Sequence, residues 1–335
     1  MTNSACSDLF HESLPGTAKS GKLFVALEHP YGWSRDILDG GVFGDELTAR
    51  IKAWLAERGG SLQLIRKSGR LGQAPCAGVT MYIAHCPPGV GFGGAGEGDG
   101  AGRPGPRLER MTVAGAEEMI GLDIRLGRPT DGAEEVDGPL LLVCTHGKRD
   151  VCCAVKGRPV ALQLGNVHPD IVWETSHSKG HRFAPALVLL PWNYSYGRLS
   201  VAETDAVIRD AAGGVLHANG CRGRGVWDAR GQVAELAARE EAGEWAMDAV
   251  AAVDVADAVG AVLADGEGTG DPEILDRLRE ILVKAPADAA AVVAFADGRR
   301  FGVTLEKTVT EGVISSCGDE PGPKKGWRAT GAVAL

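Results

Sequence analysis

The 335-residue chain lacks the features that mark several large classes of protein. It has no run of eighteen apolar residues, so we expect no membrane span. Its first residues, MTNSACSDLFHES, contain no basic region followed by an apolar core, which predicts that a secretory signal is absent. The net charge is −9, and the short basic patch at Arg222 and Arg224 stands in a glycine-rich turn, so we expect no nucleic-acid binding. Together these absences indicate a cytoplasmic protein.

Patterns that would assign the cysteines and carboxylates to common chemistries are also missing. The chain has eight cysteines, but a cytosolic protein of this size is not expected to use them as a disulfide framework. The C-x-x-C motif of thiol–disulfide enzymes does not occur, and no paired carboxylates are placed for glycoside hydrolysis. Cys152 and Cys153 are neighbours, and adjacent cysteines rarely pair with each other. We therefore expect at least one of them to be a ligand.

Two short segments supply four residues suited to one metal site. CTHGKRDVCC (144–153) contains Cys144 and Cys153, and TSHSKGHRFA (175–184) contains His177 and His181. Two thiols and two imidazoles can complete a four-ligand site, which narrows the metal to zinc or an iron–sulfur cluster. Zinc sites usually contain closely spaced C-x2–4-C pairs, so the eight residues between these cysteines favour a 2Fe–2S cluster over Zn²⁺.

The mixed donor set has a consequence for redox behaviour. Two ferric ions, two sulfides and two thiolates sum to zero charge, whereas four thiolates would leave the oxidised group anionic, so imidazole ligands predict a higher reduction potential. Positive charge surrounds the expected site, because Lys148, Arg149, Lys179 and Arg182 stand in the two loops. These side chains could favour the reduced form or dock an acidic partner. His146 and Asp150 are expected to support the site rather than to bind the metal, and Cys317 is expected to be a structural cysteine in a turn.

Hydrophobic patterning predicts strands and helices in a β-α-β-β-β-α order that occurs twice. In the first half we expect a helix over 44–58, with Asp45 as its N-cap and Gly59 at its end, and strands over 22–28, 61–66 and 79–86. In the second half we expect strands over 139–144, 171–175, 184–190 and 194–200, and helices over 154–164 and 203–210. A short sequence similarity supports the repeat. The segments RMTVAGAEEMI (110–120) and RLSVAETDAVI (198–208) each place Thr or Ser as a cap before an amphipathic helix.

These elements predict an α/β (α+β) protein with tandem thioredoxin-like domains, each with a mixed central sheet, and a smaller C-terminal α+β unit. In the C-terminal unit we expect helices over 226–242, 244–263 and 272–284 and a hairpin over 291–309 that turns at Asp297–Gly298. The Gly/Pro-rich residues 87–106 are expected to form a loop or linker. The expected organisation is a leader at 1–20, a first domain without cluster ligands at 21–130, a ferredoxin domain at 138–212 and the C-terminal domain at 225–335.

The chain resembles the sucrase/ferredoxin-like family, a branch of the thioredoxin-like 2Fe–2S ferredoxins. The resemblance runs through CTHGKRDVCCAVKGRP (144–159), TSHSKGHRFAPALVLLP (175–191) and YGRLS (196–200). It implies a thioredoxin-like fold that carries a 2Fe–2S cluster. Members with histidine ligands hold the cluster with two Cys and two His, which by motif are Cys144, Cys153, His177 and His181. Cys152 is then a neighbour of the site, although it could compete with Cys153 for the iron.

Three hypotheses for function follow. The first is a one-electron carrier or redox sensor that works with a redox partner protein and has no substrate of its own. The second is a thiol–disulfide oxidoreductase of thioredoxin-like fold, with Cys152, Cys153 or Cys144 as the nucleophile. The third is an interaction module stabilised by zinc. A coloured protein with acid-labile sulfide would distinguish the first from the other two.

Overall fold

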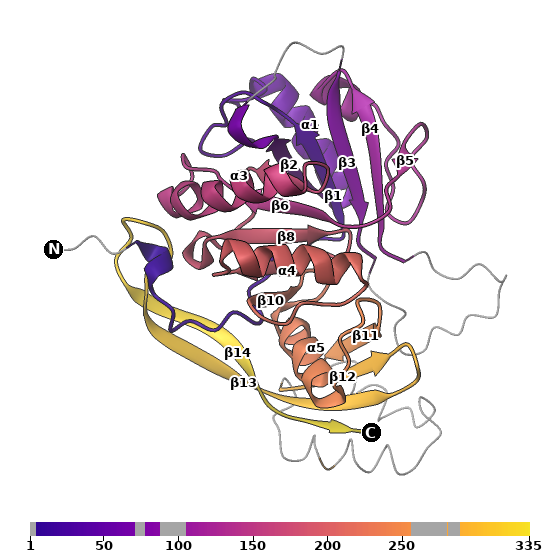
Figure 1. The fold of residues 1–335 in the computed structure, drawn as a ribbon, viewed down its shortest axis with the longest axis vertical. Helices are drawn as coiled ribbons and strands as arrows, with labels where there is room; N and C mark the ends of the chain where they lie inside the picture. The colour runs from indigo at the N-terminus through magenta and orange to yellow at the C-terminus, as the bar shows by residue number, and fades with distance from the viewer. Residues whose placement is uncertain (1–4, 71–77, 88–104, 256–279, 281–288) are drawn as a thin grey trace.

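The structure is a computed structural model that describes residues 5–70, 78–87, 105–255, 280 and 289–335. Its described part contains a ten-stranded mixed sheet and a separate four-stranded antiparallel sheet near the C-terminus (Figure 1). The ten strands follow the order β10-β9-β8-β6-β7-β2-β1-β3-β4-β5. This architecture confirms the predicted α/β class. None of the described helices is long and apolar enough to cross a membrane.

The two halves of the large sheet have the same order of elements. The first half comprises β1 (Leu23–Glu28), α1 (Asp45–Arg58), β2 (Gly60–Arg66), β3 (Val79–His85), β4 (Arg107–Val113) and α2 (Ala116–Met119). The second half comprises β6 (Leu140–Cys144), α3 (Arg158–Val167), β7 (Val172–Thr175), β8 (Ala186–Leu190), β9 (Tyr194–Gly197) and α4 (Val201–Ala212). Each half therefore has a parallel β-α-β unit followed by two antiparallel strands, in the orders β2-β1-β3-β4 and β7-β6-β8-β9.

The halves share one continuous sheet, whereas we expected a separate sheet in each. Antiparallel pairing of β2 with β7 joins them, with Ile65 opposite Thr175 and Arg66 opposite Glu174. This pairing covers two strand edges that would otherwise leave backbone N–H and C=O groups without partners. A buried ion pair reinforces it, since Arg66 Nε lies 2.8 Å from Glu174 Oε2. The domain boundaries at 21–130 and 138–212 stay predictions.

Most local expectations hold, with shifts at element ends. Gly59 ends α1 in the left-handed region at φ 60°, as predicted. Asp45 is the first helical residue and Gly44 is the N-cap, so the predicted cap is one residue late, although an acid in the first turn still favours the helix dipole. Ser200 caps α4 by accepting a hydrogen bond from the Glu203 backbone N–H at 3.2 Å. Thr112, its predicted counterpart, is instead within β4, because that strand continues three residues past Arg110.

The C-terminal unit is built on α5 (Ala229–Ala242), β11 (Val250–Val255), β12 (Ala290–Phe295), β13 (Arg300–Val313) and β14 (Gly322–Ala334). The predicted hairpin is confirmed, since β12 and β13 pair across the turn that contains Gly298. The helix predicted over 244–263 is wrong in its described part, because 250–255 pairs with β12 as β11. The helix predicted over 272–284 lies outside the described residues apart from Glu280, as does most of the loop at 87–106. The strands β14, β5 (Glu134–Glu135) and β10 (Cys221–Arg224) were not predicted.

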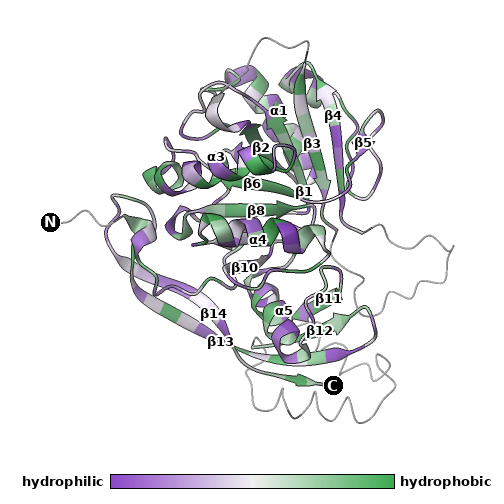
Figure 2. Ribbon diagram, viewed as in Figure 1, coloured by the Kyte–Doolittle hydropathy of each residue, from purple (hydrophilic) through white to green (hydrophobic). Residues whose placement is uncertain are grey.

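The central strands of the large sheet are more hydrophobic than the hairpin formed by β13 and β14. The central strands are apolar (Figure 2), and all five residues of β6 and of β8 are buried. The β13–β14 hairpin mixes polar and apolar residues and runs along the side of the molecule to the N-terminal turn η1 (Cys6–Asp8), as Figures 1 and 2 show. His11 Nε2 lies 3.0 Å from the Glu311 carbonyl oxygen, which ties the N-terminal segment to this hairpin. The N-terminal segment and the turn between β13 and β14 therefore meet beside the second half of the large sheet.

Candidate metal centres

The first candidate centre lies where β6 ends and the next helical segment begins. Cys144 is the last residue of β6, and Cys153 opens a π-helical turn (Cys153–Gly157) that leads into α3. π-Turns of this kind are frequent at functional sites. A Cβ atom at Gly157 would lie 2.1 Å from the Cys144 carbonyl oxygen, so only glycine lets the helical turn approach the strand this closely. The close approach brings the two buried thiols together.

His177 completes a group of three potential ligands with these cysteines. One ligand atom from each of Cys144, Cys153 and His177 lies within 4.8 Å of the others. Hydrogen bonds from the Cys153 thiol and from His177 lower the pKa of Cys144 despite its complete burial, and they favour its thiolate. The Cys153 pKa is raised, first by donation of its proton toward Cys144 and then by burial. Metal binding requires that these thiol protons be displaced.

His181 lies beside this group but is not one of the three. Its ring centroid is 5.2 Å from that of His177 with an interplanar angle of 36°. A tight turn produces this arrangement, with Lys179 at φ 61° and Gly180 at φ 96°. The His181 Nε2 atom lies 2.5 Å from the Ser315 carbonyl oxygen and 2.9 Å from Ser316 Oγ, both in the turn between β13 and β14. The structure thus groups three of the four predicted ligands and places the ring of the fourth, His181, beside that of His177.

Two histidine nitrogens are buried without a partner. Nδ1 of His177 and Nδ1 of His181 have no hydrogen-bond partner within the described structure. A buried polar atom without a partner is costly, and an imidazole nitrogen in this state is a natural metal ligand. Burial also lowers the pKa of His181, which favours the neutral ring that binds metals. The donor set therefore fits a metal ion or cluster at this place.

His146 supports the centre from outside, as expected from the sequence. Its Nε2 atom lies 2.7 Å from the Ser34 carbonyl oxygen, and its Nδ1 accepts the His177 backbone N–H at 3.1 Å. Both ring nitrogens are therefore occupied, and the ring packs edge-on against Trp33 with centroids 5.6 Å apart. His146 fixes the backbone of the histidine loop and is not available as a ligand.

A second candidate centre contains three further cysteines and Asp150. Cys6 Sγ lies 3.4 Å from Cys152 Sγ, Cys152 Sγ lies 3.0 Å from Cys317 Sγ, and Cys317 Sγ lies 3.5 Å from Cys6 Sγ. Cys6 Sγ is also 3.9 Å from each carboxylate oxygen of Asp150. Burial raises the pKa of Cys6 and raises that of Cys317 to about 11.

Sequence reasoning missed this second group because its members are far apart in the chain. Cys6 and Cys317 are separated by 311 residues and come from the predicted leader and from the C-terminal unit. Cys317, interpreted as a structural turn cysteine, instead contacts two other thiols. The one hint in the sequence was the adjacent pair Cys152 and Cys153. At least one of the two was expected to be a metal ligand, and the first centre used only Cys153, which left Cys152 without a role.

A basic cavity of about 550 Å³ opens onto the histidine loop. His177 and His181 line it together with five basic side chains from both halves of the sheet: Lys19, Arg35, Arg149, Lys179 and Arg182. Of the four basic residues expected near the site, Arg149, Lys179 and Arg182 thus line this cavity. The arrangement gives the histidine side of the first centre a positively charged entrance.

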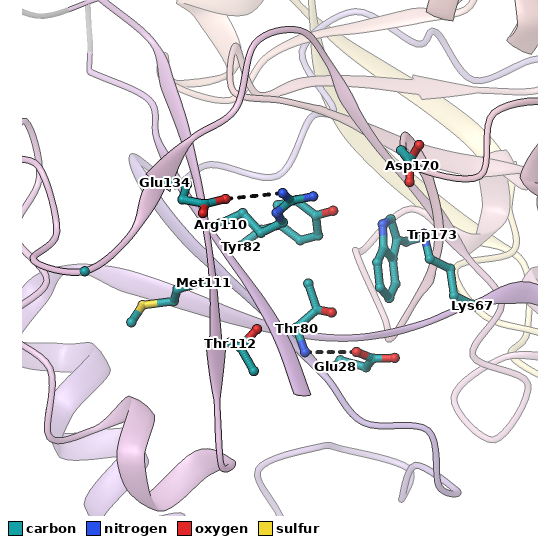
Figure 3. Close-up of a pocket in the computed structure, with 11 residues that line it drawn as sticks. Glu28, Lys67, Thr80, Tyr82, Arg110, Met111, Thr112, Glu134, Asp170 and Trp173 are labelled. Atoms are coloured by element: carbon teal, nitrogen blue, oxygen red, sulfur yellow. Dashed lines mark hydrogen bonds and ion pairs between the residues drawn. The ribbon is translucent and has the colours of Figure 1, made fainter. Parts of the chain in front are cut away.

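Another cavity, of about 490 Å³, is lined by neither cysteine nor histidine (Figure 3). Trp173, Tyr82 and Lys67 form part of its wall, with the Lys67 Nζ atom 3.6 Å from the Trp173 ring centroid. Arg110 bonds to Glu134 across this cavity, and Glu28 accepts the Thr80 backbone N–H. Among the described residues, the groups of three or more side chains that could hold a metal ion are the two cysteine centres.

Comparison with known proteins yields one family. A family model described as Sucrase/ferredoxin-like matches residues 14–223, which is more than half of the chain. The matched span contains the first candidate centre but neither Cys6 nor Cys317. Neither the curated proteins nor the solved structures include a match.

Proposed function

The chain belongs to the sucrase/ferredoxin-like family, and from this premise we propose that it is a one-electron carrier or redox sensor. In this proposal a 2Fe–2S cluster is held by Cys144, Cys153, His177 and His181. When bound, such a cluster accepts and releases a single electron. The observation that carries the proposal is the pair of buried Nδ1 atoms without partners, on His177 and His181, beside two buried thiols.

The protein's own groups would shape the properties of the site. Neutral imidazoles in place of two thiolates reduce the negative charge at the centre, which favours uptake of an electron. The Ser315 carbonyl accepts a hydrogen bond from the His181 Nε2–H, so it fixes the tautomer that leaves Nδ1 free to bind. The backbone N–H of His146 donates toward the Cys144 sulfur, and such hydrogen bonds also raise the reduction potential.

The basic cavity indicates where a partner would approach. His177 and His181 line it, so electrons would enter or leave on the histidine side. Basic side chains outnumber the one carboxylate that lines this cavity, Asp36, even with Arg182 paired to Glu12, and they would attract an acidic redox protein and speed its association. We infer that the partner presents a negatively charged surface to this cavity.

A structural Zn²⁺ ion is the second candidate, because two thiols and two imidazoles also suit tetrahedral zinc. Anaerobic purification, a visible absorption spectrum, and iron and sulfide analysis distinguish the two. We expect a brown protein with about two irons and two sulfides per chain, and a bleached or shifted spectrum for His177→Ala. A colourless protein that contains zinc and no acid-labile sulfide would contradict the proposal.

A further inference from the structure

We propose that Cys6, Cys152, Cys317 and Asp150 form a second, separate metal site that binds one Zn²⁺ ion and fastens the N-terminal segment and the turn between β13 and β14 to the segment that follows β6. The proposal goes beyond the electron-carrier function and does not depend on it. It rests on the position, burial and chemistry of these four side chains.

The three sulfur atoms already form a compact triangle. Their separations of 3.0, 3.4 and 3.5 Å are slightly shorter than the edge of about 3.8 Å that a tetrahedral ion with Zn–S bonds of about 2.3 Å requires. A small expansion of the triangle would therefore admit the ion. One ligand atom from each of the four residues lies within 4.8 Å of the others, which is compatible with a single ion.

Asp150 supplies the fourth donor and holds two of the thiols in position. One carboxylate oxygen accepts the Cys152 backbone N–H at 2.9 Å, and the other accepts the Cys317 backbone N–H at 2.9 Å. The same side chain therefore fixes residues that are 165 positions apart in sequence. Each oxygen keeps a lone pair for a metal, and a hydrogen-bonded carboxylate is the usual form of such a ligand.

The chemistry of the set selects zinc. Three thiolates exclude the hard cations Mg²⁺ and Ca²⁺, and a carboxylate oxygen among them is less suited to Cu(I) than to Zn²⁺. A disulfide would use only two of the three sulfurs and would leave the third thiol and the carboxylate buried together. The site is also closed: Cys6, Cys152 and Asp150 are buried, and the apolar side chains of Ala184 and Ile314 pack around it, as expected for a structural site.

A metal ion at the second site would hold the turn between β13 and β14 against the first centre. Cys317 stands in the same turn as Ser315 and Ser316, whose oxygens contact His181 Nε2. His181 Nε2 is also 3.7 Å from Asp150 Oδ2. An ion held by Cys317 and Cys152 would keep this turn against His181, so the two centres are adjacent but use different ligands.

Metal analysis of the full-length protein tests the proposal. Zinc and iron are measured per chain in wild type, in Cys6→Ser and Cys317→Ser, and in Cys86→Ala as a control. Cys86 is fully buried but lies outside both groups. We expect about one zinc per chain in wild type and in the control, and a drop of at least about tenfold in both serine variants with iron unchanged.

The variants should fold, because other contacts hold the same segments. Arg182 makes two hydrogen bonds to Glu12, at 2.6 and 2.8 Å, and Lys156 Nζ lies 2.9 Å from the Ser7 carbonyl oxygen. These contacts keep the N-terminal segment in place when Cys6 loses its sulfur. Circular dichroism and gel filtration confirm the folded state of each variant before its metal content is compared.

Three results would overturn the proposal. The first is a wild type that contains no zinc and binds none when the reduced protein is titrated with Zn²⁺ against a chromophoric chelator. The second is zinc that stays in Cys317→Ser but is lost in Cys144→Ser, which would place the ion at the first centre. The third is a count of free thiols in denaturant without reductant that reveals a disulfide among Cys6, Cys152 and Cys317. Absence of iron with zinc behaving as expected would refute the electron-carrier function alone.

Discussion

Cys152 and Cys153 are adjacent in the chain, yet their thiols belong to different buried groups. Cys153 lies with Cys144 and His177, whereas Cys152 Sγ lies 3.0 Å from Cys317 Sγ and 3.4 Å from Cys6 Sγ. Successive residues of a helical turn point in different directions, so one turn can serve two sites. The structure therefore groups Cys153, and not Cys152, with Cys144 and His177.

Serine substitutions at these two positions should separate the sites. We expect Cys153→Ser to lose the visible absorption and most of its iron, because it removes a donor of the first centre. Cys152→Ser should keep the iron and its spectrum and lose zinc. Absorption spectra and metal analysis of the two variants, purified side by side under argon, make the comparison. Loss of the iron spectrum in Cys152→Ser but not in Cys153→Ser would reverse the assignment.

The sequence predicted the local parts of the first centre because they lie in two compact motifs. Cys144 ends β6, Cys153 opens the π-helical turn and His177 lies in the loop after β7, and the structure brings them together. The repeated β-α-β-β-β-α order could also be predicted, since each element has its own hydrophobic period. The β2–β7 pairing could not, because no local pattern records which strand edges meet.

Long-range partners were beyond sequence reasoning for the same reason. Cys6 and Cys317 carry no motif, and only the fold of the β13–β14 hairpin places one beside the other. The helix predicted over 244–263 failed because this segment alternates in burial rather than in apolar character: Val250 and Ala252 are buried and Ala251 between them is half-buried, which suits a strand that pairs with β12. Pairing with β12 therefore decided between a helix and a strand for this segment.

Gly157→Ala should damage the first centre through packing alone. The added methyl group would meet the Cys144 carbonyl oxygen at 2.1 Å, so the π-turn must move away from β6 and carry Cys153 with it. We expect loss of most of the iron and a decrease of about 1–3 kcal/mol in the free energy of unfolding, as for overpacked cores.

The matched control for this change is Gly165→Ala in α3. There the nearest atom to the new methyl group is the Ser68 side-chain oxygen at 3.2 Å, which a small rotation can relieve. Iron content and urea unfolding of both variants are measured together. Equal iron in the two variants would show that the close approach at Gly157 does not set the distance between the thiols.

Replacing one histidine by cysteine should lower the reduction potential. His181→Cys adds a thiolate to the first centre and makes the oxidised group more anionic, so an added electron is less favourable. We expect a decrease on the order of 100 mV in a spectroelectrochemical titration. His146→Gln is the control, because His146 has both nitrogens engaged elsewhere and should leave the potential nearly unchanged. A potential that does not fall in folded, iron-loaded His181→Cys would argue against histidine ligation.

The potential of the wild type should depend on pH. An imidazole ligand can lose its ring N–H proton while the cluster is oxidised and regain it when an electron is added. Above the pKa of this N–H in the oxidised state, reduction therefore takes up one proton. The potential then falls as pH rises, by about 59 mV per pH unit for one proton per electron. Voltammetry between about pH 6 and 9 measures the slope. A flat profile over this range would contradict the histidine assignment, and the slope should decrease in His181→Cys.

Arg239→Met should destabilise the junction between the C-terminal unit and the large sheet. Arg239 in α5 and its partner Glu235 are fully buried, with Nε 3.1 Å from Oε1, and Arg239 also bonds to the hydroxyl of Tyr194 in β9. Removal of one member of a buried pair leaves an uncompensated charge, so we expect a loss of about 3–5 kcal/mol in the free energy of unfolding.

Arg230→Met is the control for this change, because Arg230 and Asp228 form a partly exposed pair that should contribute no more than about 1 kcal/mol. Chemical denaturation of both variants gives the comparison. The double variant Arg239→Met with Glu235→Leu should recover most of the loss, since it removes both charges. If it does not, the hydrogen bonds from Arg239 to the Ala246 and Met247 carbonyls, at 2.8 and 3.2 Å, hold α5 in place and the charge on Glu235 is secondary.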